Sequence, residues 1–202
     1  GGDGSHTHPT QALTDMYTVI GRKGKIEGVT VGICGDLRYG RAAHSFALAI
    51  ARFGGTLIHI APDGFQMPHW VLSRMKDLYN QEPIEAAHLT DVIKELDVIY
   101  VNRLQEERLP ADMDPEVARA TYLVNADVMR NAKSDAMIMH PLPRVDELSF
   151  ELDEDPRAAY FEQSANAIPT RMALIASLTG LEELVLTQPP TREISVGHQL
   201  CD

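Results

Sequence analysis

Residues 136–147 read AMIMHPLPRVDE, an apolar run that leads into a segment with two prolines. The run 136–139 predicts a buried β-strand. Proline has no N–H to give to a strand ladder, so Pro141 and Pro143 end the strand and turn the backbone outward. Ligands of open α/β sheets lie at the carboxyl ends of strands, where the carbonyl of Leu142 is then free to accept a hydrogen bond. Taken alone, this motif favours a proline-rich turn that binds nothing.

Short apolar runs alternate with amphipathic stretches along the rest of the chain. Strands are predicted at 29–35, 56–61, 84–88, 97–102 and 136–139, and helices at 10–20, 41–53, 68–79, 90–96, 115–132 and 161–178. This alternation of strands and helices is typical of parallel strands joined by right-handed crossovers. The sequence therefore predicts a doubly wound, Rossmann-like α/β fold, a parallel sheet flanked by helices. Residues 187–202 lack periodicity and are expected to form a disordered tail.

Composition narrows the classes of function. The formal net charge is −11, from 18 Lys and Arg against 29 Asp and Glu. Such a chain is not expected to bind nucleic acid, because neutralising phosphates needs a basic surface. Anionic small molecules remain compatible with this charge, because charges beyond about 10 Å are largely screened at physiological salt.

The chain shows no sign of a membrane or secreted protein. No apolar run has the length of a membrane span, and no signal peptide opens the sequence. The two cysteines, Cys34 and Cys201, do not suggest a disulfide framework. We therefore expect a cytoplasmic protein.

Two arginines follow predicted strands. Arg41 ends the stretch GDLRYGR at 35–41, which leaves a strand and opens a helix, a place where backbone N–H groups favour an anion. Arg103 directly follows the strand at 97–102, where a guanidinium can grip a carboxylate. A tight loop without a ligand and a surface salt bridge are the alternative interpretations. The loop does not read Gly-x-Gly-x-x-Gly, which argues against a dinucleotide cofactor.

His8 and Gln11 begin a predicted helix three residues apart, and hence share a face. A histidine at a helix start is more often a cap or a packing group than a catalyst. His6 lies close by, but without cysteine or carboxylate companions the pair is not expected to bind zinc. The sequence thus predicts neither a metal nor a cofactor.

Together, the blocks HTHPTQAL (6–13), GDLRYGR (35–41), NRLQEER (102–108) and MHPLPRVDE (139–147) resemble the aspartate-binding half of the aspartate transcarbamoylase family. The resemblance covers the chain to about residue 186, so it implies one aspartate-binding domain at 1–186. It also implies that helices at about 8–20 and 161–179 bridge to an N-terminal carbamoyl-phosphate domain, whose phosphate loop is nowhere in this sequence.

The resemblance also implies a role for individual residues. Arg41, Arg103 and Gln105 would bind aspartate, with Asp36 and Glu107 holding polar partners in place. His8 would donate to the carbonyl oxygen of carbamoyl phosphate. Its amide would be held by the residues Gln11, Leu142 and Pro143.

The reaction implied is attack by the α-amine of L-aspartate on carbamoyl phosphate, giving N-carbamoyl-L-aspartate and phosphate in pyrimidine biosynthesis. Family members form trimers, so a homotrimer is expected of the full-length protein, and this chain alone is expected to be inactive.

An ornithine transcarbamoylase is the nearest alternative. It usually has His-Cys-Leu-Pro where Pro141 stands here, and Arg103 has the wrong sign for an ornithine amine. A non-catalytic partner module of a pyrimidine-pathway assembly is the other alternative.

Overall fold

The centre of the molecule is a parallel β-sheet. The computed structural model describes residues 4, 6–103, 114, 117, 120 and 122–183. The strands are β1 (Thr30–Gly35), β2 (Thr56–Ile60), β3 (Ile84–Ala86), β4 (Val98–Asn102) and β5 (Met137–Met139). All of the predicted strands are therefore confirmed, with small differences at their ends.

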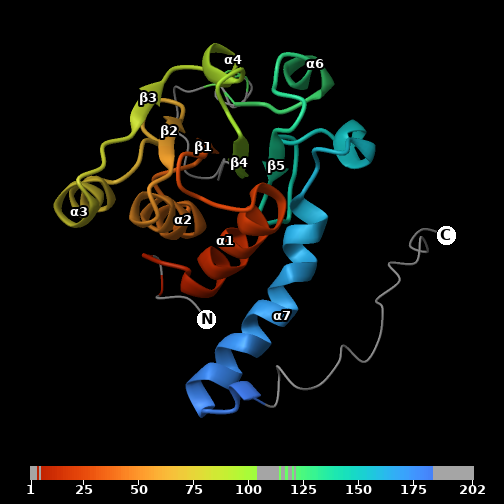
Figure 1. Ribbon diagram of the computed structural model, residues 1–202. Helices are drawn as coiled ribbons and strands as arrows, with labels where there is room; N and C mark the ends of the chain where they lie inside the picture. The colour runs from red at the N-terminus through yellow and green to blue at the C-terminus, as the bar shows by residue number, and fades with distance from the viewer. Residues whose placement is uncertain are drawn as a thin grey trace.

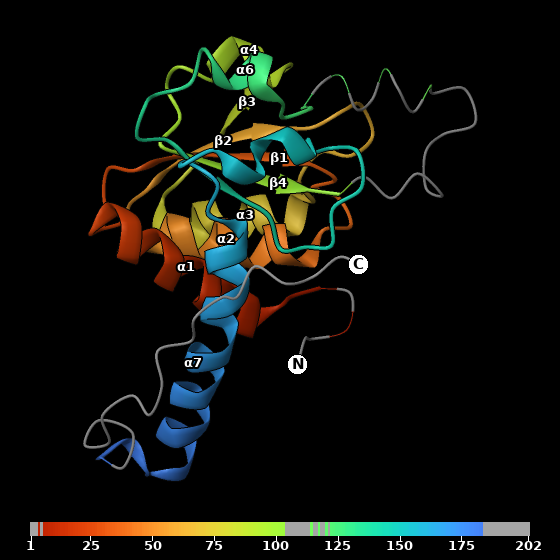
Figure 2. The ribbon, with the colours of Figure 1, turned by 90° about the vertical axis from the view of Figure 1, so that its right-hand side faces the viewer.

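Helices cover both faces of this sheet (Figures 1 and 2). They are α1 (Pro9–Lys23), α2 (Arg41–Arg52), α3 (His69–Tyr79), α4 (Leu89–Val92), α6 (Ala126–Met129), α7 (Tyr160–Thr179) and the 3₁₀ helix η2 (Phe150–Glu154). In Figure 2, α1, α2 and α3 lie below the sheet, and α4 and α6 lie above it. The predicted doubly wound α/β fold is confirmed.

Each face of the sheet has its own hydrophobic core. Side chains of α1, α2 and α3 pack on one face, around the stacked rings of Phe46 and Tyr100. The other core contains Leu96, Tyr122 and Leu148, from the segments around α4, α6 and η2. Apart from the edge strand β3, the strands are largely buried on both sides, which explains why they read as apolar runs rather than as alternating patterns.

The strand order reverses in the middle of the sheet. The order is β3-β2-β1-β4-β5, so the chain runs outward from β1 to β3 and then crosses back to β4. Gly35 and Asn102, the last residues of β1 and β4, are direct partners in the register. This reversal is a topological switch point, where open α/β sheets form a crevice beyond their carboxyl edge.

One expectation from the sequence is wrong in part. The segment 115–132 was expected to be helical, but Tyr122 is in a turn, Asn125 is extended and α6 is short. Val124 forms a parallel bridge with Leu148, and the two flanking hydrogen bonds join Val124 to Glu147 and Ser149. Asn125 then caps α6 through its side chain. The apolar residues here pack under a strand-like bridge, which periodicity alone does not distinguish from a helix.

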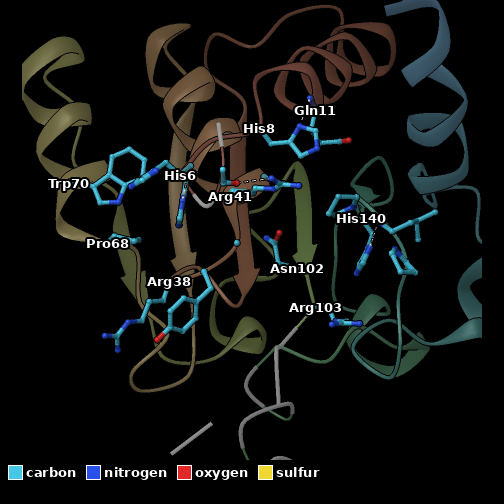
Figure 3. A pocket seen from close by; sticks show the side chains of 18 residues that line it. His6, His8, Gln11, Arg38, Arg41, Pro68, Trp70, Asn102, Arg103 and His140 are labelled. Carbon is cyan, nitrogen blue, oxygen red and sulfur yellow. Dashed lines mark hydrogen bonds between the residues drawn. The ribbon is translucent and has the colours of Figure 1, made fainter. Parts of the chain in front are cut away.

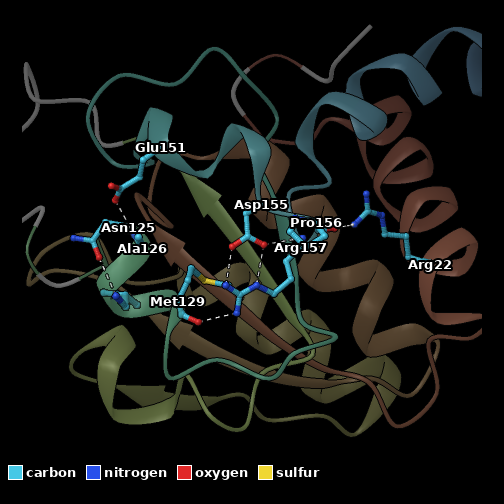
Figure 4. A network of polar contacts seen from close by, with 9 residues as sticks. Arg22, Asn125, Ala126, Met129, Glu151, Asp155, Pro156 and Arg157 are labelled. Carbon is cyan, nitrogen blue, oxygen red and sulfur yellow. Dashed lines mark hydrogen bonds and ion pairs between the residues drawn. The ribbon is translucent and has the colours of Figure 1, made fainter. Parts of the chain in front are cut away.

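A polar network fastens the segment after η2 to the edge of the sheet (Figure 4). Arg157 donates to both carboxylate oxygens of Asp155 and, at 2.7 Å, to the carbonyl of Met129. Arg22 of α1 donates to the carbonyls of Pro156 and Ala158. Ala158 also bridges to Ile138 of β5, so this network sets where α7 begins.

α7 packs against α1 at its start and then extends beyond the sheet (Figure 1). It continues through Pro169 to Thr179. Its outer apolar side chains are more than half exposed: Phe161, Ile168, Met172, Ile175 and Leu178. Within the described residues, no helix has both the length and the hydropathy of a membrane span.

Gly35 lets β1 and β4 end side by side. Its φ is 99°, a left-handed conformation that favours glycine. A Cβ at this position would lie 2.1 Å from the carbonyl oxygen of Asn102. The close approach of the two strand ends therefore depends on the absence of a side chain here.

We expect Gly35→Ala to lower the free energy of unfolding by about 3 kcal/mol or more, through backbone strain together with the clash against Asn102. Gly64→Ala is the matched control, since Gly64 has φ 82° but nothing within 4 Å of an added Cβ. Gly64→Ala should lower the free energy of unfolding by about 1 kcal/mol, the cost of the left-handed conformation alone. Urea unfolding measures the loss in both variants, and equal losses would contradict the close approach of the strand ends at Gly35.

Candidate functional site

A cavity of about 720 Å³ opens at the switch point, beyond the carboxyl ends of β1 and β4. Its walls come from the start of α1, the loop 36–40, the start of α2, the start of α3, the end of β4 and the loop 140–143 (Figure 3). The lining residues are Gly4, His6, His8, Gln11, Arg38, Tyr39, Gly40, Arg41, Ala42, His44, Pro68, Trp70, Asn102, Arg103, His140, Pro141, Leu142 and Pro143. The structure thus brings together residues from each of the four blocks singled out in the sequence, although of the block 102–108 it describes only Asn102 and Arg103.

The loop between β1 and α2 places Arg41 at the cavity. Arg41 is the first residue of α2, and its Nη1 donates to the carbonyl of Gly4 at 2.7 Å. Asp36 is fully buried, and its Oδ1 accepts from the backbone N–H of Tyr39 at 2.8 Å. Asp36 therefore holds the backbone of the loop that carries Arg41, which agrees with a supporting role.

Arg103 reaches the same cavity from the end of β4. Figure 3 shows Asn102 between Arg41 and Arg103, while Arg38 extends away from both. Arg38 donates to the carbonyl of Gly64 instead. Gln105 and Glu107, the expected companions of Arg103, lie outside the described residues.

His8 caps α1 and presents a neutral ring to the cavity. Its Nδ1 accepts from the N–H of Gln11 at 3.4 Å and lies 3.5 Å from the Thr10 hydroxyl, which leaves the proton on Nε2. Partial burial, and then the nearby charges of Arg41 and Arg171, lower the pKa of His8 below its ordinary 6.5. At neutral pH the ring can therefore donate one hydrogen bond without carrying a charge.

The loop after β5 is shaped by the buried ring of His140. Its Nδ1 accepts from the N–H of Leu142 at 2.8 Å, so Nε2 carries the proton and donates to Glu147 at 2.9 Å. Burial is the largest influence on the pKa of Glu147 and acts to raise it, but the hydrogen bond from His140, the backbone hydrogen bonds and the electrostatic attraction of His140 together outweigh burial, and the pKa lies below its usual range. This pair holds Leu142, whose φ is 53°, in a left-handed conformation at the cavity wall.

Gln11 points its amide nitrogen away from solvent, toward the buried carboxylate of Asp15. The distance from Gln11 Nε2 to Asp15 Oδ1 is 2.8 Å. Tyr100 and Gln163 donate to the same carboxylate. Burial raises the pKa of Asp15 to about 6, even though these donors oppose the shift.

An aromatic wall at the cavity was missed by sequence reasoning. Trp70 makes edge-to-face contacts with His44, at 5.3 Å between ring centroids, and with His6 at 6.2 Å. The buried His44 also lies 2.8 Å from the carbonyl of Leu37 and 2.9 Å from that of His6. Trp70 is the only tryptophan of the chain and follows Pro68 at a helix start, a signal that could have indicated the wall.

The chemistry available in the cavity suits an anion. Arg41 and Arg103 bring positive charge, His8 offers a neutral N–H, and the loop 140–143 offers backbone carbonyls. Among the residues that the structure describes, no three His, Cys, Asp or Glu side chains gather as metal ligands would. A small molecule with both carboxylate and amide groups would match these donors and acceptors.

We expect nuclear magnetic resonance titration of the His8 ring to give a pKa below 6.5. Arg41→Met should raise that pKa toward 6.5 because it removes a nearby positive charge, although the effect of burial remains. Arg38→Met, at the same cavity but turned away, should leave it unchanged. The electrostatics described above would be contradicted if Arg41→Met left the His8 pKa unchanged, or if Arg38→Met changed it by the same amount.

Asp15 should make stability depend on pH. Because the folded protein holds the Asp15 proton more tightly than the unfolded chain does, ionisation costs stability as pH rises from about 4 to about 6. The full cost is about 3 kcal/mol. Asp15→Asn does not ionise and so has no such cost. The free energy of unfolding of Asp15→Asn minus that of wild type should therefore rise by about 3 kcal/mol as pH increases from about 4 to about 6. Urea unfolding at several pH values tests this, and a difference that is constant with pH would refute it.

Comparisons with known proteins agree with this geometry. Residues 27–178 match the family model described as aspartate/ornithine carbamoyltransferase, Asp/Orn binding domain. The aspartate carbamoyltransferase catalytic subunit of Clostridium acetobutylicum is 42% identical over 181 residues, which are 89% of this chain and 59% of that protein. The corresponding subunit of Bifidobacterium adolescentis is 44% identical over 182 residues, 90% of this chain and 57% of the relative.

Solved structures give the same result. Aspartate transcarbamoylase from Trypanosoma cruzi, in complex with carbamoyl aspartate and phosphate, has a TM-score of 0.80 and 38% identity, covering 87% of this chain and 57% of that one. The catalytic subunit from M. Jannaschii has a TM-score of 0.79 and 35% identity, covering 93% and 60%. The chain spans about three fifths of the length of these relatives. The fold, the cavity and these matches together establish that the chain belongs to the aspartate/ornithine carbamoyltransferase family, as its Asp/Orn binding domain.

Proposed function

We propose that this chain is the aspartate-binding half of an aspartate transcarbamoylase. The observation that carries the proposal is that Arg41, at the start of α2 beyond β1, and Arg103, at the end of the neighbouring strand β4, line one cavity. Two guanidinium groups suit the two carboxylates of L-aspartate, each in charge-assisted hydrogen bonds. Gln105 would assist Arg103 and Glu107 would orient it.

The reaction would join the α-amine of aspartate to the carbamoyl carbon of carbamoyl phosphate. The new N–C bond forms as the bond from carbon to the phosphate oxygen breaks, and the amine loses a proton that the departing phosphate can take. His8 would donate to the carbonyl oxygen as negative charge develops there. Gln11 and the carbonyls of Leu142 and Pro143 would accept from the carbamoyl amide. Holding both reactants in contact supplies much of the acceleration.

The family also contains ornithine carbamoyltransferases, and the cavity favours aspartate over ornithine. The side chain of ornithine ends in an ammonium group, which would lie against the guanidinium of Arg103 in the same place where aspartate has a carboxylate. Like charges in a cleft repel, whereas opposite charges there attract. Charge therefore separates the two substrates more clearly than size does.

The remaining part of the enzyme is proposed to precede Gly1 and to bind the phosphate of carbamoyl phosphate. The exposed apolar side chains on α1 and α7 support this arrangement, since they need a partner to cover them. We further propose a cytoplasmic homotrimer for the complete protein. Turnover is expected only from a completed enzyme, in which the amino-terminal portion of the Bifidobacterium adolescentis relative is joined to Gly1.

The proposal predicts that L-aspartate binds this chain weakly and that L-ornithine does not. In a nuclear magnetic resonance titration of backbone amides, aspartate should shift the signals of Arg41, Arg103 and Leu142. Arg41→Met or Arg103→Met should weaken binding about 10-fold or more, because each removes a charge-assisted hydrogen bond. Arg38→Met, the matched control, should bind as wild type does. Equal binding of ornithine, or equal damage from Arg38→Met, would refute the assignment.

A further inference from the structure

A buried carboxylate lies behind the cavity without lining it. Asp15 is on α1, one turn beyond Gln11, and is fully buried. Its Oδ1 accepts from Gln11 Nε2 at 2.8 Å and from Gln163 Nε2 at 2.7 Å, and its Oδ2 accepts from the Tyr100 hydroxyl at 2.8 Å. These donors come from α1, α7 and β4, which meet at this point.

An ionised carboxylate can only accept hydrogen bonds, so it decides how both glutamine amides are turned. Each amide must aim its NH₂ group at Asp15, and its oxygen must then face away. Gln11 lines the cavity, so its Oε1 is left as an acceptor on the cavity side. Without the carboxylate, the two ends of the Gln11 amide would compete for that position.

Gln163, the second glutamine, connects Asp15 to the loop after β5. Gln163 Oε1 accepts from the backbone N–H of His140 at 2.9 Å. The ring of His140 accepts in turn from the N–H of Leu142 at 2.8 Å. The backbone at Leu142, whose carbonyl is the other expected acceptor, is therefore tied to Asp15 through two side chains.

We infer that Asp15 is a positioning residue that orients both sets of acceptors for the carbamoyl amide, the Gln11 oxygen directly and the Leu142 carbonyl through Gln163 and His140. The inference rests on the proposed function and deepens it, since it names the group that makes the site select an amide. Asp15 itself touches no substrate.

Stability alone does not account for an acid in this place. Burial raises the pKa of Asp15 to about 6, so its ionised form is less favourable in the folded protein than in water. A well-packed apolar side chain often stabilises such a position as well or better. A group that lowers stability while fixing polar atoms at a cavity is what a functional site requires.

The test compares two acyl phosphates in the completed enzyme. Acetyl phosphate has a methyl group where carbamoyl phosphate has its NH₂, so the ratio of their dissociation constants isolates recognition of the amide. We expect wild type to favour carbamoyl phosphate by about 10-fold or more, because acceptors left unpaired against a methyl group are costly. Asp15→Ala should bring the ratio close to one, because it should weaken the binding of carbamoyl phosphate and leave the binding of acetyl phosphate nearly unchanged.

Two variants separate positioning from a general loss of structure. Asp15→Asn keeps an oxygen for both glutamines and can donate to the Tyr100 oxygen, so it should restore most of the ratio. Thr18→Val removes a buried hydroxyl of the same helix, which bonds to Thr14 and Asn166, and should keep the full ratio. If Asp15→Ala does not fold, Gln163→Met serves instead. It removes the link from Asp15 to His140 but keeps the bond between Asp15 and Gln11, so the preference for carbamoyl phosphate should fall only in part.

The outcomes are distinct. A wild-type ratio near one would overturn the proposed function and this inference with it. A clear wild-type preference that persists in Asp15→Ala, or in Gln163→Met where Asp15→Ala does not fold, would overturn the inference alone. Equal weakening of both acyl phosphates in Asp15→Ala would likewise overturn it, because that pattern belongs to a structural role.

Discussion

The parallel pairing of β1 with β4 is the constraint on which the site depends. Because the strand order reverses between these strands, the chain leaves their carboxyl ends in different directions and opens a crevice there. Gly35 and Asn102 are partners in the register, and the missing side chain at Gly35 lets the two ends come together. Arg41 and Arg103 then reach one cavity from segments that are far apart in sequence.

Charge in the cavity is set locally and not by the protein as a whole. The chain carries a net charge of −11, yet arginines line the cavity at its switch point. Screening by salt makes this compatible with anionic substrates, because distant surface acids contribute little at the site. The local surroundings act more strongly: Arg41 helps to keep His8 neutral, and burial makes Asp15 harder to ionise. The site thus combines a neutral donor, positive charge and fixed acceptors within one crevice.

The sequence predicted the sheet and the strand-end arginines well, because buried parallel strands and strand-end positions leave local patterns. It could not predict the Asp15 network, since Asp15 and Gln163 are 148 residues apart and no periodicity links them. The expected helix at 115–132 failed around Val124 because an apolar run under a strand-like bridge resembles a buried helix. The roles of Arg41, Arg103, His8, Gln11, Leu142 and Pro143 stay predictions, although all of them line the cavity.

The central claim is that two guanidinium groups at neighbouring strand ends hold the two carboxylates of one amino acid. A crystal structure of the completed enzyme with L-aspartate and phosphate tests it most directly. The account predicts one carboxylate on Arg41, the side-chain carboxylate on Arg103, and the α-amine facing His8 and Leu142. Aspartate bound through only one of these arginines, or outside the cavity, would contradict it.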